Sequence, residues 1–323
     1  MENYSPFSPR LTEQVASVTE TELICRIRGW LGDSCPEAPK GIGDDCAVTS
    51  LDSQAKYLLT TVDGVGWKKH FDERVPSEMA GRKLLARNLS DIASMGGVPV
   101  QAVVSLWLAG EVSLRWLQRF YEGIATLALE YGVSIVGGDV SSAPEGVFIA
   151  DLCLEGFCEK SLLRRQVKAG DTLWVTGALG GSLLEKHYAF TPRLAEGQWL
   201  QRSGWAKSMI DVSDGLGKDM PSLVGGYRVK VFDLPVSDDA REMAKASGRS
   251  AIDHALNDGE DYELLFAVDS SCDELKLVEQ WQRDFTTPLT KIGLIESATS
   301  DGTFEWVDET GVPLKPGRGY EHF

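Results

Sequence analysis

Long apolar runs and secretion signals are missing from this 323-residue sequence. No apolar stretch approaches the roughly 18 residues that a transmembrane helix needs, and the N-terminus has neither the basic nor the apolar region of a signal peptide. The six cysteines show no C-x-x-C spacing and are too few for a disulfide scaffold of this length. We therefore expect a cytoplasmic protein with reduced thiols and no membrane contact.

Positive charge is scarce as well. The chain has 32 Lys and Arg against 48 Asp and Glu, which gives a formal net charge of -16 at pH 7. No stripe of Lys or Arg appears, and this argues against a nucleic-acid-binding surface. Hydrophobic residues make up 43% and charged residues 25%, as is ordinary for a soluble globular protein, and the length allows two domains with separate cores.

The usual phosphate-binding loops are also absent. The sequence has no G-x-x-x-x-G-K-[ST], and its nearest glycine cluster, at 177–182, lacks the lysine that reaches the phosphates. It also lacks the H-R-D and D-F-G motifs of protein kinases. Phosphoryl transfer still requires only positioning and charge neutralisation, because its transition state is loose and highly anionic. Mg²⁺ ions held by carboxylates can supply that neutralisation.

What the chain does have is a set of aspartates, each placed where an apolar run meets Gly, Ser or Asn. In such numbers, hard oxygen ligands suit Mg²⁺ held against phosphate better than zinc or iron. For any one of them, however, a turn or a helix cap explains the residue equally well. The set is Asp44, Asp45, Asp63, Asp91, Asp139, Asp211 and Asp214.

Asp91 is the hardest of these to explain as a cap. It falls inside a helical pattern over 76–95, where Asp has poor helix propensity and finds no free backbone donor. Leu84, Asn88 and Asp91 share one face of that helix. An apolar-looking face that carries an amide and a carboxylate requires partners for both, and a metal ion would supply one.

The N-terminal part of the chain reads as strands interleaved with long helices. After a polar, flexible tail over 1–20, Thr19 stands three residues before a glutamate, which is capping-box spacing and predicts a helix start. Ser113 opens an amphipathic helix that ends near Tyr131. These elements predict an N-terminal domain over 21–160. Its strand-length apolar runs lie at 57–62, 100–108, 134–139 and 147–157.

A second block follows the polar turn at 168–171. Strands and helices continue to alternate, including a helix predicted from Gly181, and this alternation indicates α/β packing. We expect a C-terminal domain over 161–323. Its strand-like runs lie at 209–212, 229–234, 262–268 and 291–295, and further helices are predicted from about Ser213, over 239–246 and after Ser271.

In their order along the chain, seven segments resemble the thiamine-monophosphate kinase family: GIGDDCAV, TTVDGVGWKKHF, ARNLSDIASMGGVPV, IVGGDV, MIDVSDGL, GEDYELLF and GYEHF. The resemblance covers roughly residues 22 to 323. It implies the two-domain fold of the aminoimidazole ribonucleotide synthetase-like superfamily, of α/β and α+β class. In that fold an N-terminal ATP-binding domain dimerises through its sheet and makes the nucleotide site, and a C-terminal α+β domain completes the site.

The same resemblance implies an activity. The reaction is direct transfer of the γ-phosphate of ATP onto the phosphate of thiamine monophosphate, assisted by several Mg²⁺ ions, to give thiamine diphosphate. No side-chain nucleophile is required, because the acceptor phosphate is already anionic. The implied partners are ATP, thiamine monophosphate and a second copy of the chain in a homodimer.

The family's site residues carry over onto the matching positions of this chain. By resemblance the metal ligands are Asp45, Thr61, Asp63, Asp91, Asp139, Asp211 and Asp214, with Asp63, Asp139 and Asp214 taken as catalytic. The ATP-binding positions are Tyr121, Gly138, Asp139, Arg164 and Ser213. The substrate-facing positions are His70 and Glu260, and Trp67 is taken to replace a ring that stacks on the thiamine.

Plainer roles stay open for four of these residues. Tyr121 can equally pack its helix, and Arg164 can lie exposed before a turn. His70 can be a surface histidine after a lysine pair, and Glu260 can cap the entrance to a strand.

The chain also departs from the family near the predicted substrate. The segment 67–69 (Trp-Lys-Lys) replaces small or acidic residues, Gly317 replaces a stacking aromatic residue, and Val62 and Val140 replace threonines. Two alternatives to the kinase therefore remain. One is a related ATP-dependent enzyme with a different acceptor, and the other is a non-catalytic nucleotide-binding module.

Overall fold

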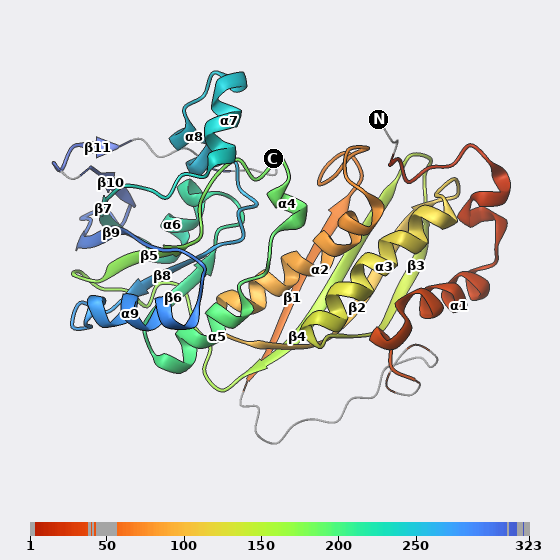
Figure 1. Cartoon of the computed structure of the whole chain (residues 1–323), viewed down its shortest axis with the longest axis horizontal. Coiled ribbons are helices and arrows are strands. Elements are labelled where there is room, and N and C mark those ends of the chain that lie inside the picture. The colour runs from red at the N-terminus through yellow and green to blue at the C-terminus, as the bar shows by residue number, and fades with distance from the viewer. Residues whose placement is uncertain are drawn as a thin grey trace. The chain divides into compact units, whose positions relative to one another are not determined.

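The structure is a computed structural model that describes residues 4–37, 40, 42, 57–308, 310–314 and 319. The chain forms two compact units, one of Met1–Ile92 with Val98–Glu159 and the other of Ala93–Gly97 with Lys160–Phe323. In Figure 1 the first unit runs from red to yellow-green and the second from green to blue. Across the described ranges, no helix is long and apolar enough to cross a membrane.

The first unit is built on a four-stranded sheet in the order β1-β4-β2-β3. Strand β4 pairs antiparallel with both β1 and β2, whereas β3 runs parallel to β2. Parallel neighbours require a crossover, and helix α3 (Leu114–Tyr131) provides it. The strands are β1 (Tyr57–Gly66), β2 (Val98–Ala109), β3 (Ser134–Ala143) and β4 (Phe148–Cys158).

Helices α2 (Ser77–Ser94) and α3 lie side by side over one face of this sheet (Figure 1). Ser113 caps the first turn of α3 and Gly132 ends the helix with a left-handed φ, so the predicted helix bounds are confirmed. The two helices cross where Gly81 and Gly123 let their backbones touch. A Cβ on Gly81 would fall 1.8 Å from a carbonyl oxygen of α3, and a Cβ on Gly123 1.9 Å from one of α2.

The N-terminal segment is not the loose tail that we expected. The backbone N–H groups of Ser8 and Val15 donate to the carbonyls of Glu111 and Val112, at 3.0 and 2.7 Å. Composition alone could not predict this, because the pairing segment is distant in the sequence. The helix start predicted at Thr19 is confirmed, since its side chain accepts from the Glu22 N–H in the first turn of α1. The elements here are η1 (Leu11–Glu13), η2 (Val15–Ser17), α1 (Glu20–Leu31) and η3 (Gly32–Ser34).

The second unit contains a seven-stranded sheet in the order β11-β10-β7-β9-β5-β8-β6. All neighbouring strands are antiparallel except β10 and β7. The alternation of strands and helices therefore does not produce parallel α/β packing here, and the α+β class implied by the resemblance is confirmed. The strands are β5 (Thr172–Thr176), β6 (Ala206–Asp211), β7 (Tyr227–Val231), β8 (Leu264–Val268), β9 (Leu289–Ala298), β10 (Glu305–Val307) and β11 (Pro313–Leu314).

The helix predicted from Gly181 is wrong. Gly180 and Gly181 have φ values of 80° and 74°, which turn the chain instead of opening a helix. The chain becomes helical only at α4, five residues later. The helices of this unit are α4 (Lys186–Ala189), α5 (Leu194–Ser203), α6 (Leu216–Val224), α7 (Asp238–Ser247), α8 (Ala251–Asn257) and α9 (Glu274–Asp284).

The core of the second unit holds the turn between β6 and α6 in place. Val212 and Leu216, on either side of this turn, are fully buried with Leu265 of β8 and Ile292 of β9. Each such side chain stabilises the fold by roughly 1.5–3 kcal/mol. The residues between them, 213–215, are therefore fixed at the edge of a packed core.

Candidate functional site

Three predicted site residues meet between strand β1 and helix α2 of the first unit. Thr61 and Asp63 pair with buried residues of β4, so they lie on the face of β1 that the helices cover. Thr61 Oγ1 donates to Asp91 Oδ2 of α2 at 2.5 Å. Asp63 Oδ1 lies 3.2 Å from Arg87 Nη2. The Asp91 carboxylate thus has a polar partner from another element, as its place on an apolar helix face required.

Asn88 lies one turn before Asp91 and is fully buried. Its Nδ2 donates to Leu84 O at 2.9 Å and to Asp63 O at 3.4 Å, which fixes the orientation of the amide. The other amide atom, Oδ1, is buried with no hydrogen-bond partner in the described part of the chain. An unsatisfied buried acceptor costs about 1–3 kcal/mol. A water molecule or a cation beside Asp63 and Asp91 would satisfy it.

Gly138 and Asp139 lie on β3, at the opposite edge of the sheet from β1. Asp139 is exposed, and its Oδ2 accepts from Ser141 Oγ at 3.0 Å. Since β4 and β2 separate the two edges, Asp139 is roughly 14 Å from Asp63, at about 4.8 Å per strand. One metal ion therefore cannot be bound by Asp63 and Asp139 of the same chain.

Asp151 of β4 is an acidic residue that the sequence analysis missed. It pairs with Gly64 of β1. A Cβ on Gly64 would lie 2.1 Å from Asp151 Oδ1, so only glycine lets this carboxylate lie over β1. In the sequence, Asp151 follows the ordinary alternation of a half-exposed strand, and only the pairing reveals the close approach.

His70 and Trp67 lie in the turn that follows β1. His70 Nδ1 accepts from the Gly66 N–H at 3.0 Å, so a neutral ring carries its proton on Nε2. Trp67 is half-buried and packs edge-on against Phe7 and Phe71. The structure therefore holds both rings in one turn of the first unit.

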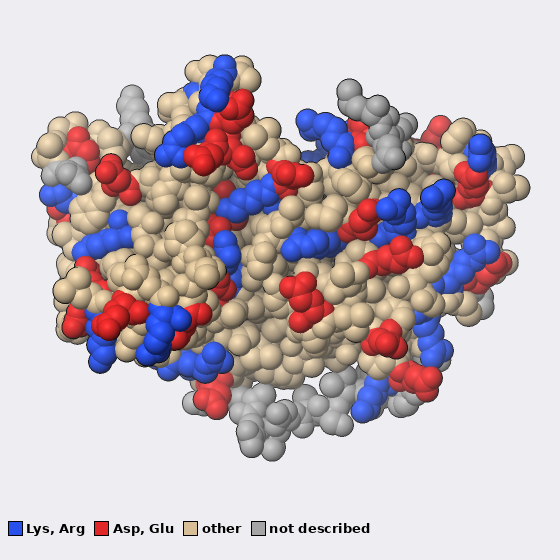
Figure 2. All heavy atoms as spheres, in the orientation of Figure 1, with Lys and Arg blue, Asp and Glu red and all other residues tan. Residues whose placement is uncertain are grey.

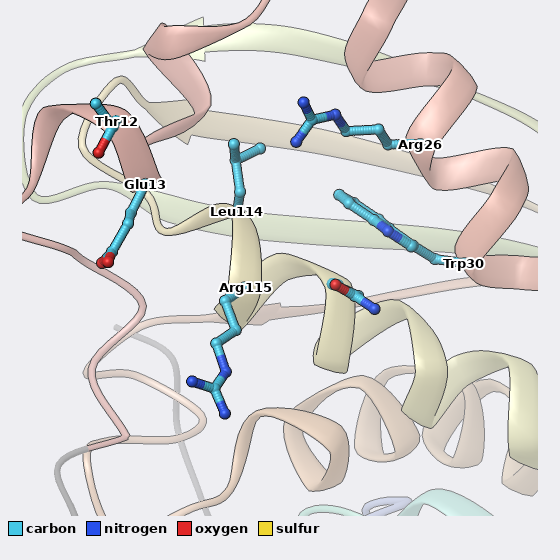
Figure 3. A pocket seen from close by; sticks show the side chains of 7 residues that line it. Thr12, Glu13, Arg26, Trp30, Leu114 and Arg115 are labelled. Atoms are coloured by element: carbon cyan, nitrogen blue, oxygen red, sulfur yellow. The ribbon is translucent and has the colours of Figure 1, made fainter.

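Tyr121 is buried in α3 and packs against Trp30 of α1, with ring centroids 6.2 Å apart. Burial raises the pKa of its phenol. Trp30 also borders a pocket of about 450 Å³ between the N-terminal segment, α1 and α3 (Figure 3). None of the predicted site residues lines this pocket, whose walls are Thr12, Glu13, Arg26, Trp30, Leu114, Arg115 and Gln118.

In the second unit, Asp211, Ser213 and Asp214 lie at the turn between β6 and α6. Asp211 is the buried last residue of the strand, and Asp214 Oδ2 pairs with Lys218 Nζ at 2.6 Å. The turn precedes a nine-residue helix. Because the N–H groups and the dipole at a helix N-terminus favour anions, this turn is suited to phosphate.

Asp219, which the sequence analysis also missed, holds this turn from within α6. Its Oδ2 accepts from the Asp214 N–H at 2.9 Å. Burial raises the pKa of Asp219 to about 7, and the Asp214 carboxylate acts in the same direction. The exposed Arg164 opposes the shift, so its guanidinium lies close enough to affect the charge of the turn. The sequence feature that could have pointed to Asp219 is its position in the first turn of a helix that follows Ser-Asp-Gly.

Glu260 belongs to a loop that is hydrogen-bonded to the same turn. Its N–H donates to Ser213 O at 2.7 Å, and the Tyr262 N–H donates to Val212 O at 2.8 Å. Both Glu260 and Tyr262 have left-handed φ values, 55° and 51°. For residues with a side chain this costs about 1–3 kcal/mol each, and such strain is typical of functional loops.

A buried ionic network supports this loop. Glu263 accepts from Arg193 Nε and Nη2 at 2.8 and 2.9 Å, from Lys186 Nζ at 2.9 Å and from Thr176 Oγ1 at 2.7 Å. Burial alone would raise the pKa of Glu263, but the charges of Lys186 and Arg193 outweigh it and hold the pKa below its usual value. The network ties the start of the loop's strand to α4 and α5.

Asp261, in the middle of the loop, should make the stability of the protein depend on pH. Burial raises its pKa to about 7, and Lys186 and the Gly180 N–H only partly offset this. The pKa in an unfolded chain is about 4, so between pH 4 and 7 the folded state holds a proton that the unfolded state has lost. The free energy of unfolding therefore falls as pH rises through this window, by up to about 1.4 kcal/mol per pH unit.

We expect Asp261→Asn to remove this contribution, because Asn does not titrate but still accepts from Gly180 N–H. The free energy of unfolding of the variant, measured with urea and expressed relative to that of the wild type, should rise by about 2–3 kcal/mol from pH 5 to pH 8. Asp238→Asn, at a fully exposed carboxylate of α7, is the control and should show no such gain. An equal difference from the wild type at both pH values would contradict the assignment.

A further hydrogen-bonded cluster lies in α7 and α8. Ser247 Oγ is 2.8 Å from His254 Nε2, and His254 Nδ1 is 2.8 Å from Asp258 Oδ2. The order matches a Ser-His-Asp relay, but Ser247 ends α7, where the helix dipole opposes an oxyanion. Asp258 also accepts from the Gly181 N–H at 3.2 Å. The cluster therefore ties the two helices to the glycine turn.

The surface shown in Figure 2 carries mixed charge. Lysines and arginines are interspersed with carboxylates, and on the described part of this face they form no continuous basic stripe. In the described part of the chain, no three His, Cys, Asp or Glu side chains are arranged to hold a metal by themselves. Asp44, Asp45 and Gly317 lie outside the described residues.

The chain is similar to known proteins over most of its length. Residues 43–156 match the family model described as AIR synthase related protein, N-terminal domain. A thiamine-monophosphate kinase of Rhodopirellula baltica is 36% identical over 82% of this chain and 85% of its own length. The kinase of Escherichia coli K12 is 31% identical over 77% and 82%.

Solved structures of thiamine-monophosphate kinases are also similar to this chain. AaThiL complexed with AMPPCP and TMP is 27% identical, covers 98% of this chain and all of its own, and has a TM-score of 0.71. Thiamine monophosphate kinase from Aquifex aeolicus is 26% identical over 80% and 90%, with a TM-score of 0.69. The hydrogenase maturation protein HypE of E. coli, at 17% identity over 94% and 99% and a TM-score of 0.74, shares the fold alone.

Proposed function

The chain belongs to the thiamine-monophosphate kinase family, and from this membership we propose that it transfers the γ-phosphate of ATP to thiamine monophosphate, giving thiamine diphosphate. The observation that carries the proposal is the similarity, over nearly the whole of both chains, to a structure that holds AMPPCP and TMP together. AMPPCP is an analogue of ATP, so that structure binds both substrates of the proposed reaction. Use of ATP agrees with a cytoplasmic location.

The proposal includes Mg²⁺ as the cofactor. The β1–α2 cluster offers the Thr61 hydroxyl, the carboxylates of Asp63 and Asp91, and the buried Asn88 Oδ1, an all-oxygen set of the kind that Mg²⁺ prefers. In the second unit Asp211 and Asp214 would serve the same purpose, and by resemblance Asp45 and Asp139 complete the set. When bound, Mg²⁺ would neutralise the phosphate charge.

The chain's own residues would bind and orient the phosphates. The turn at Ser213 and Asp214 presents the N-terminus of α6, and the nearby Arg164 can fork onto a phosphate. Gly138 and Tyr121 remain proposed ATP contacts, and His70 and Trp67 proposed contacts of the acceptor. Direct transfer needs no protein nucleophile, since the acceptor is already an anion.

The first unit supports the proposed homodimer through an uncovered apolar face. The helices cover one face of its sheet, while the other exposes Leu58, Val62, Val103, Trp107 and Ile149, at 40–64% of their surfaces. Large apolar side chains exposed on an uncovered sheet face typically mark an interface. A second copy would also bring another Asp139 to a site whose β1 edge lies far from its own Asp139.

Trp107→Glu should therefore convert the dimer to a monomer, because it places a charge on this face, where the dimer would bury it. Sedimentation or light scattering of the purified protein measures the change. Leu129→Glu is the matched control, since Leu129 is 56% exposed on helix α3 and should leave the dimer intact. A wild type that is monomeric at micromolar concentration would rule out the homodimer.

The experiment that tests the function measures ADP release from Mg²⁺-ATP with and without thiamine monophosphate, and identifies the thiamine product by chromatography. Thiamine diphosphate formed in step with ADP is the expected result. ADP released without thiamine diphosphate would favour a different acceptor. ATP binding without any ADP release would favour the non-catalytic module.

A further inference from the structure

The N-terminal segment 4–8 pairs with the loop between β2 and α3. Its Pro6 carbonyl accepts from the Ser113 N–H at 2.6 Å. Next to this hydrogen bond, Phe7 and Val112 form an antiparallel bridge. These contacts involve only backbone atoms, so the half-buried side chain of Phe7 makes contacts of its own.

The turn that follows β1, residues 67–71, has a strained backbone. Lys68 has a left-handed φ of 64°, which is unfavourable for a residue with a side chain. Its N–H donates to Phe71 O at 2.8 Å, and this bond closes the turn. The fully buried Lys83 of α2 supports the turn by donating Nζ to His70 O at 2.9 Å. A strained turn of this kind persists only where its surroundings hold it in place.

Aromatic rings connect the turn to the N-terminal segment. Phe7 packs edge-on against Trp67, with ring centroids 6.1 Å apart, and Trp67 packs against Phe71 at 5.6 Å. Phe71 is buried and stacked on Trp116, with centroids 5.8 Å apart and planes at 16°. Trp116 Nε1 in turn donates to Tyr4 O at 2.8 Å. The four rings and this hydrogen bond form a closed connection from the segment to the turn and back.

The same contacts explain two features of the sequence. One is the polar N-terminal segment, and the other is the Trp-Lys-Lys sequence at 67–69, which replaces small or acidic residues of the family. Trp67 gives the N-terminal segment a ring to pack against. Just after the turn, Glu73 pairs with Lys68, and its carbonyl accepts from the Tyr4 N–H at 3.4 Å. The two features therefore belong to one set of contacts.

Building on the proposed function, in which His70 contacts the acceptor, we propose that Phe7 is a positioning residue that acts on the His70 turn through Trp67. His70 Nδ1 accepts from the Gly66 N–H at 3.0 Å, so the direction of the ring depends on the conformation of the turn. Phe7 holds the turn in that conformation from outside. The N-terminal segment contains none of the predicted site residues, yet it then contributes to the affinity for the acceptor.

The kinetic test compares Phe7→Ala with Phe7→Tyr. Loss of the ring should raise the KM for thiamine monophosphate about fivefold, as expected when one edge-on aromatic pair is lost, with kcat and the KM for ATP unchanged. Phe7→Tyr keeps the ring and should restore the wild-type KM. Leu11→Ala, in the adjoining η1 at a side chain that is 77% exposed, is the matched control and should behave as the wild type.

A double variant tests whether Phe7 acts through Trp67. Trp67→Ala removes the partner ring, so adding Phe7→Ala to it should raise the KM for the acceptor no further. Additive effects of the two substitutions on KM would show that Phe7 does not act through Trp67, and would overturn the proposal.

Hydrogen exchange measures the turn directly and requires no turnover. The N–H groups of Lys68 and His70 donate within the turn at 2.8 and 2.9 Å, so their exchange reports its opening. Phe7→Ala should speed the exchange of these amides about fivefold and leave those of strand β4 unchanged. A merely structural role would instead lower the melting temperature and speed exchange throughout the first unit. Wild-type exchange in the turn, or faster exchange with an unchanged KM, would overturn the proposal.

The positioning role and the kinase activity fail in different ways. If the wild type forms no thiamine diphosphate, the proposed function fails. Faster exchange confined to the turn in Phe7→Ala would then still support the positioning of the His70 turn by Phe7, and unchanged exchange would overturn it.

Discussion

Replacing Asp91 by Asn is expected to lower kcat by about 100- to 1000-fold, the range seen when a group that stabilises transition-state charge is removed. Asn has the same shape, and its carbonyl oxygen can still accept from Thr61 Oγ1, which lies 2.5 Å from the present carboxylate. The substitution removes the negative charge and turns the second carboxylate oxygen into an amide donor. Steady-state ADP release at saturating Mg²⁺-ATP and acceptor measures the effect.

The stability of the same variant shows whether Asp91 is a functional or a structural residue. A carboxylate held within a helix face for its charge should be replaceable by Asn with little loss of stability, because the Thr61 hydrogen bond remains. Glu78→Gln, on the first turn of the same helix and paired with Arg119, is the control for activity and should keep kcat. An Asp91→Asn variant with full activity would show that the negative charge of Asp91 is not needed for catalysis.

Asp91 could be singled out from the sequence as a candidate metal ligand because the features that mark it are local. Helix propensity, the 3.6-residue period and the neighbouring Asn88 all lie within one element, and the structure places that element as predicted. The caps at Thr19 and Ser113 were predictable for the same reason. The resemblance supplied the two-domain fold, which periodicity alone would have read as parallel α/β packing.

The unpredicted features depend on which segments meet. The separation of Asp63 from Asp139 follows from strand order, and the approach of Asp151 to Gly64 follows from register. Neither strand order nor register can be read from the local composition of the sequence. The partners of Glu263 are distant in the sequence, although a glutamate inside the apolar run YELLFAV was a sign that a buried cation lay opposite.

Glu263→Gln is expected to destabilise the second unit by about 3–5 kcal/mol. The side chain of Glu263 is only 2% exposed, and its carboxylate balances the charges of Arg193 and Lys186. Removing the negative charge leaves two cations facing a neutral amide in a site of low dielectric. Urea unfolding at pH 7 measures the loss. Because the network holds Glu260 and Tyr262 in strained conformations, the KM for the acceptor should rise as well.

The double variant Arg193→Met/Glu263→Gln distinguishes a charge effect from lost packing. If the penalty of Glu263→Gln is mainly the uncompensated charge of Arg193, then removing Arg193 as well should recover part of the stability, so that the two losses are not additive. Glu274→Gln is the matched surface control. Glu274 pairs with Lys291 at 2.8 Å but is one-third exposed, and its replacement should cost at most about 1 kcal/mol. Equal effects at Glu263 and Glu274 would show that burial of the Glu263 network contributes nothing beyond an ordinary surface ion pair.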